Sequence, residues 1–142
     1  MRRLFCALPV VMCLTICGCV ALEKPPFPDI TAANVSIPTR LGTYGWSTRG
    51  HGIQSDAPVP DEFVSDAVPV SVPPGSTLSI HYEHTPRDLF ACLWLQHKPT
   101  RVAITKGILQ LPTAPGVYVY SLEATWKEGH ASHVIKVAVR PE

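Results

Sequence analysis

Histidines are the side chains of this chain that are best suited to bind a metal ion, and the sequence contains six of them. The closest pairs are His81 with His84 and His130 with His133. Residues three apart on a strand point to opposite faces, so the first pair would need a bulge to share one ion. The second pair lies at a predicted turn, where two side chains can converge. Because no cysteine or carboxylate cluster completes a set of three or four ligands, we expect no metal site and no cofactor.

Hydrolysis is the other chemistry that the residue types allow. Ser47, Ser55 and Ser65 lie near histidines and aspartates, but no nucleophile-elbow glycine pattern surrounds any of them. Cys92 lies in an apolar stretch, where we expect its thiol to be buried and unreactive. We therefore expect the chain not to be an enzyme, with a metal-dependent hydrolase as the alternative.

The residues that end at Cys19 predict a covalent modification. A short positive segment, Met1-Arg2-Arg3, precedes an uncharged apolar run from Leu4 to Ile16, which is typical of a signal peptide and too short for a permanent membrane span. The run ends in Ile16-Cys17-Gly18-Cys19, which resembles a bacterial lipobox. We expect residues 1–18 to be removed and Cys19 to be lipidated, so that the protein is anchored on the extracytoplasmic face of the cell membrane. The alternative is an ordinary signal peptide that is cut nearby.

Charge argues against nucleic acid as a partner. The chain has 12 basic and 11 acidic residues; without Arg2 and Arg3 it has 10 and 11, a net charge of −1. Lysines and arginines are scattered singly, without the clustering that phosphate contacts need. We expect a membrane contact through the lipid and no nucleic-acid binding.

Residues 19–33 predict a tether. They contain Pro25, Pro26 and Pro28, and proline favours an extended, semi-rigid chain. We expect this segment to be poorly ordered and to separate the membrane from a single domain over residues 34–142.

The domain is predicted to be all-β, because its apolar residues recur every second position rather than with a helical period. A short helical turn is expected after Pro60. The number and spacing of the strands favour a two-sheet immunoglobulin-like β-sandwich. The predicted strands are Thr39 to Trp46, Gly52 to Ser55, Val68 to Val72, Thr77 to His84, Leu89 to Gln96, Arg101 to Thr105, Ile108 to Leu111, and a terminal hairpin of Val117 to Lys127 with His133 to Val139.

A short motif carries a family resemblance. The segment Leu41-Gly42-Thr43-Tyr44-Gly45-Trp46 is followed by Gly50 and Gly52, then by Asp56-Ala57-Pro58, and later by Pro73-Pro74-Gly75. This pattern resembles a family of small, largely uncharacterised Gram-positive lipoproteins and secreted proteins with a Gly-(Ser/Thr)-Tyr-x-Trp motif. Some members bridge this region with two cysteines, which are absent here. The resemblance implies an extracytoplasmic β domain and no particular activity.

Four residues near the glycine-rich turn could form a binding loop: Tyr44, Trp46, Arg49 and His51. Aromatic and arginine side chains dominate binding hot spots. The alternative is that Tyr44 and Trp46 fill the core, which would leave Ser47 to Gln54 as the contact loop. We therefore expect a binding or accessory module for a protein, peptide or cell-wall ligand. The alternative is a β-sandwich proteinase inhibitor, suggested by the hairpin that begins at Gly116.

Overall fold

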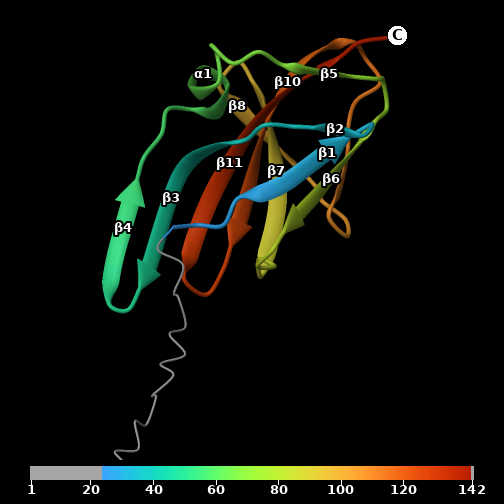
Figure 1. Cartoon of the computed structure of the whole chain (residues 1–142). Coiled ribbons are helices and arrows are strands. Elements are labelled where there is room, and N and C mark those ends of the chain that lie inside the picture. The colour runs from blue at the N-terminus through green and yellow to red at the C-terminus, as the bar shows by residue number, and fades with distance from the viewer. Residues whose placement is uncertain (1–23, 142) are drawn as a thin grey trace, which may run out of the picture.

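The computed structural model describes residues 24–141 and shows two antiparallel sheets packed face to face (Figure 1). The predicted all-β sandwich is confirmed. The predicted signal peptide and Cys19 lie outside the described residues.

Eleven strands and one short helix make up the described part. The smaller sheet has the order β2-β1-β6-β9, and the larger has the order β4-β3-β11-β10-β7-β8, with β5 paired to the end of β11. The elements are β1 (Pro28–Ala32), β2 (Val35–Ser36), β3 (Arg40–Thr48), β4 (His51–Ser55), α1 (Pro60–Phe63), β5 (Val70–Val72), β6 (Thr77–Tyr82), β7 (Asp88–Leu95), β8 (Lys98–Val102), β9 (Ile108–Gln110), β10 (Gly116–Thr125) and β11 (Gly129–Val139).

Consecutive strands are divided between the two sheets. Strands β6 and β9 belong to the smaller sheet, and β7, β8, β10 and β11 to the larger one, while β5 runs parallel to β11. The hydroxyl of Tyr118 donates a hydrogen bond to the carbonyl oxygen of Ala114 over 2.8 Å, which ties the start of β10 to the segment that precedes it. The segment between β1 and β5 is an insertion that adds the β3–β4 hairpin to the edge of the larger sheet.

The core lies between the two sheets and follows the alternation of the sequence. In β6, for example, Leu78, Ile80 and Tyr82 are buried and the residues between them are exposed, as predicted. The ring of Tyr82 lies edge-on to that of Trp126, with centroids 5.2 Å apart. Strands β10 and β11 pair with neighbours on both sides and are buried along most of their length.

Residues 28–32 correct the predicted tether. They form β1, which pairs with β6, and Pro28, Ile30 and Ala32 face the core. Pro28 is tolerated because it is the first residue of the strand, where a missing N–H costs little. The folded domain therefore begins before residue 34.

The other correction concerns Cys92, which is half-exposed rather than buried. Strand β7 turns Ala91 toward the core and Cys92 toward the outer face of the larger sheet. Partial burial and the nearby Glu123 carboxylate raise the pKa of the Cys92 thiol.

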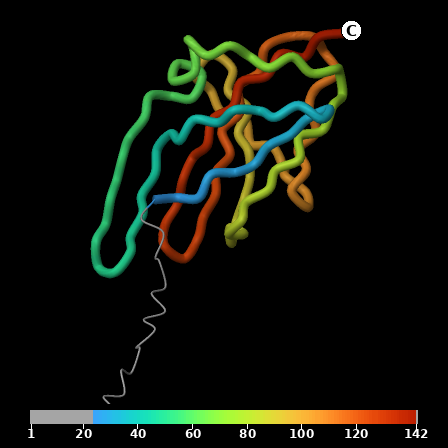
Figure 2. Tube along the Cα trace, in the orientation of Figure 1, coloured from blue at the N-terminus to red at the C-terminus, as the bar shows by residue number. Residues whose placement is uncertain are grey.

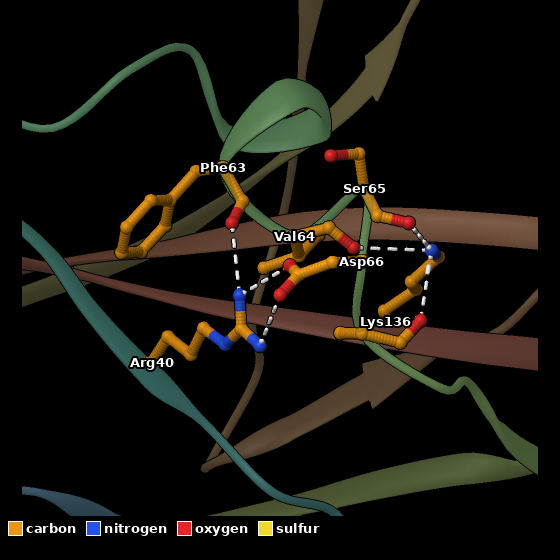
Figure 3. Close-up of polar contacts among 7 residues, drawn as sticks. Arg40, Phe63, Val64, Ser65, Asp66 and Lys136 are labelled. Atoms are coloured by element: carbon orange, nitrogen blue, oxygen red, sulfur yellow. Dashed lines mark hydrogen bonds and ion pairs between the residues drawn. The ribbon is translucent and has the colours of Figure 1, made fainter.

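The segment around α1 is held against the outer face of the larger sheet by two cations (Figure 3). The Nζ of Lys136 donates to the carbonyl oxygens of Val64, Ser65 and Ala67 over 2.9–3.0 Å. The guanidinium of Arg40 pairs with Asp66 at 2.7 Å and lowers the pKa of that carboxyl. Figure 3 shows that one cation comes from β3 and the other from β11, so α1 fixes the insertion to the sandwich.

Candidate functional site

The β3–β4 hairpin extends from the side of the molecule, with β4 outermost (Figure 2). Its turn is Arg49-Gly50, and both residues have positive φ, 50° and 80°, as a type I′ turn requires. All five residues of β4 are exposed. The stretch Ser47 to Gln54, expected as a loop, is therefore two paired strand ends joined by a two-residue turn.

Trp46 fastens the base of the hairpin to the core. Its side chain is only 3% exposed, and its ring lies edge-on to that of Trp126 with centroids 5.5 Å apart. Tyr44 is half-buried and also packs against the core. The structure thus corrects the binding loop that included these two residues, because both point to the sandwich interior, and it confirms the core alternative.

Arg49 and His51, the other two residues of that predicted loop, are exposed at the tip of the hairpin. Trp46, by contrast, is buried. The predicted four-residue site is therefore divided between the core and the tip.

A groove of about 490 Å³ lies along the hairpin. Gly45 stands between Gln54 of β4 and His130 of β11, directly opposite both, so these three residues share the outer face of the sheet. Gly52 lies on the same face, opposite Ser47. The groove is lined by Gly45, Trp46, Ser47, Gly52, Ile53, Gln54, Glu128 and His130.

Two glycines form the floor of this groove. A Cβ atom at Gly45 would come within 2.9 Å of Cε1 of His130, so the absence of a side chain lets the imidazole lie across the strand. A Cβ atom at Gly52 would meet no atom within 4 Å, so the groove is open above it.

The far wall of the groove comes from the β10–β11 turn. The backbone N–H of Ser47 donates to the carbonyl oxygen of Glu128 over 2.9 Å. Gly129 is required next to it, since a Cβ atom there would collide with the carbonyl oxygen of Gly45. Glu128 carries no signal in the sequence, and His130 suggests only a metal ligand, because the pairing of β3 with β11 spans more than 80 residues of sequence.

The histidine pairs do not converge. His130 and His133 lie in β11 rather than in a turn, and they point to opposite faces. His81 is exposed in β6, and His84 follows the end of that strand. Within residues 24–141, no group of three or more histidine, cysteine, aspartate or glutamate side chains is placed to hold a metal ion.

His133 belongs to a polar pair inside the core. Its Nδ1 lies 3.0 Å from the hydroxyl of Tyr82, and its Nε2 is buried without a hydrogen-bond partner. Burial lowers the pKa of His133 to about 4. The side chain is therefore neutral at pH 7 and serves the fold rather than the groove.

Among the described residues, no helix has the length and apolar character to cross a membrane. No protein-family model matches the chain, and neither the curated proteins nor the solved structures contain a significant match. The groove must therefore be interpreted from its own chemistry: a carboxylate, an imidazole, an amide and a hydroxyl around a glycine floor.

Proposed function

We propose that this protein is a lipid-anchored extracytoplasmic binding module that takes a protein, peptide or cell-wall ligand in the groove of the β3–β4 hairpin. The observation that carries the proposal is the combination of an exposed hairpin with a groove on one face and a base fixed in the core through Trp46. The lipobox-like segment that ends at Cys19 supports the proposed location on the extracytoplasmic face of the membrane.

The attachment of the hairpin supports this proposal. The chain leaving β4 is tied back to β3, because the backbone N–H of Ala57 donates to Oγ1 of Thr43 over 3.1 Å. Arg40 and Lys136 then hold the α1 segment. A binding surface on strands that are anchored at both ends loses little conformational entropy when the ligand binds.

Four of the lining residues carry polar side chains, namely Ser47, Gln54, Glu128 and His130, so we expect hydrogen bonds to contribute to recognition. The amide of Gln54 can both donate and accept a hydrogen bond, and the carboxylate of Glu128 can accept one. The imidazole of His130 has two ring nitrogens that can form hydrogen bonds. Extended peptides and glycans both present hydrogen-bond donors and acceptors that these side chains could bind. This chemistry needs no cofactor.

Photo-crosslinking on intact cells tests the proposal. A photoreactive amino acid at Gln54 would lie in the groove, and the same amino acid at Thr100, an exposed residue of β8, would be the matched control. We expect one species other than a second copy of the chain to be captured from position 54 and not from position 100. A Cys19→Ser form should lose this capture if the anchor brings ligand and groove together. Equal capture from both positions would contradict the site.

The inhibitor alternative receives no support from the described residues. Strand β10, which suggested it, lies between β7 and β11 and is paired on both sides. Both edges of β10 are therefore occupied within the sheet. We therefore put forward no second function.

A further inference from the structure

Strand β4 is the one long edge strand among residues 24–141 that carries no protection against pairing. Natural sheets guard their edges with prolines, charges or very short strands. Strand β8 contains Lys98, Pro99 and Arg101, and β2, β5 and β9 have only two or three residues each. Strand β4, His-Gly-Ile-Gln-Ser, has five residues with neither proline nor a charged carboxylate, lysine or arginine side chain.

The free backbone groups of this edge follow from the hairpin geometry. A two-residue turn is flanked by a hydrogen-bonded pair, here Thr48 with His51, and such pairs alternate along an antiparallel ladder. Ile53 therefore bonds to β3, whereas the N–H and C=O groups of Gly52 and Gln54 point away from it. These two N–H groups and two C=O groups can therefore form hydrogen bonds with another strand.

From this edge we infer that two copies of the chain pair β4 to β4, antiparallel, about a twofold axis through Ile53. In this register Gly52 faces Gln54 of the second copy in a hydrogen-bonded pair, and the reverse pair is equivalent. The four hydrogen bonds use the outward-pointing groups of both residues in both copies. The two larger sheets then become one continuous sheet.

The side chains of β4 suit this register. Ile53, which is 46% exposed, meets Ile53 of the second copy, so that an apolar side chain is covered. His51 faces Ser55 of the second copy, and the two side chains can form a hydrogen bond with each other.

Pairing would also join the two grooves, and this part of the inference rests on the proposed function. Gln54 of each copy lies beside Gly52 of the other, on the outer face that carries the groove. Each groove thereby gains a side chain from the second copy. A twofold axis normal to the larger sheet leaves both smaller sheets on one face, so both chains can be tethered to one membrane.

The pairing should be weak in dilute solution and stronger on a membrane. Five residues per edge bury less surface than the about 1,200 Å² or more of a standard stable interface. Anchoring two chains to one membrane raises their effective concentration without any new contact. The test should therefore use the full-length, exported protein in its membrane.

Disulfide trapping provides this test, in a Cys92→Ser background that removes the native thiol of the domain. The Cα atoms of a non-hydrogen-bonded cross-strand pair lie about 4.5 Å apart, within the range of a disulfide. We expect Ile53→Cys to form a disulfide-linked dimer as the main species after mild oxidation. Thr100→Cys, in the middle of the other long edge, is the matched control and should stay monomeric.

The register has its own test. Gly52→Cys and Gln54→Cys should each fail to cross-link alone, because neither residue faces its own copy, but two size-tagged chains carrying one change each should link to one another. Failure of Ile53→Cys to link, or equal linking through Thr100→Cys, would overturn the inference. Ligand capture at Gln54 without any dimer would leave the proposed function intact, and a dimer without ligand capture would leave the pairing intact.

Discussion

His133 shows how one buried side chain sets a property of the whole fold. Its pKa is lowered from 6.5 to about 4 by burial, so the unfolded chain takes up a proton at a higher pH than the folded chain. Stability from this residue is fully present above pH 6.5 and decreases as the pH falls toward 4, by about 3 kcal/mol in total.

Urea unfolding between pH 4 and 7 measures this effect. We expect a His133→Leu variant to be less stable at pH 7, because the hydroxyl of Tyr82 loses its partner, but to show a flatter dependence on pH in this window. An unchanged slope in the variant would contradict the assignment of the acid sensitivity to His133.

Gly129 gives a second prediction at the scale of one residue. We expect Gly129→Ala to destabilise the domain by about 2 kcal/mol or more, since the new Cβ atom collides with the carbonyl oxygen of Gly45 and separates β11 from β3. Gly52→Ala is the matched control, because open space surrounds it, and should change the free energy of unfolding by less than about 0.5 kcal/mol. Thermal and urea unfolding would show whether the two variants differ.

Among the elements, α1 depends on its contacts because four residues cannot form a stable helix alone. Replacing Lys136 by Met keeps the aliphatic stem but removes three hydrogen bonds from an ammonium group to carbonyl oxygens. We expect a loss of about 1–3 kcal/mol and faster hydrogen exchange in residues 63–67. Lys98→Met, on the exposed edge strand β8, should have no such effect.

Among the strands, those with strict alternation gave the clearest signal in the sequence. Leu78, Ile80 and Tyr82 marked β6, and the alternation from Tyr118 to Ala124 marked β10. Strand β1 was not predicted because three prolines lie in it or just before it. Pro28, Ile30 and Ala32 nevertheless alternate with polar residues, as in a strand. The prolines indicated extended chain correctly, but extended chain is also what a strand needs.

The candidate site was harder to predict than the strands that build it. The glycine-rich hairpin and the stretch from Ser47 to Gln54 were recognisable, as was the possibility that Trp46 belongs to the core. Glu128 and His130 were not, because their position depends on the register between β3 and β11. Local sequence does not encode a register across such a distance.

For the whole molecule, the boundary of the domain leads to a clear prediction. A chain that starts at Asn34 lacks β1, which covers one side of β6 and contributes Ile30 and Ala32 to the core. We expect this chain to lose cooperative unfolding, whereas a chain that starts at Lys24 should unfold in one transition. Circular dichroism during heating distinguishes them, and equal transitions would place β1 outside the folding unit.

The pairing of β3 with β11 also has a consequence for the order in which the molecule forms. Strand β3 is synthesised early, but its partner β11 is the last strand among the described residues, so β3 lacks a neighbour on that side until β11 has been synthesised. The groove cannot form before β11 is present, because His130 of β11 lines it. A product truncated before Gly129 would lack His130 and the strand that pairs with β3, so the groove would be restricted to chains that include β11.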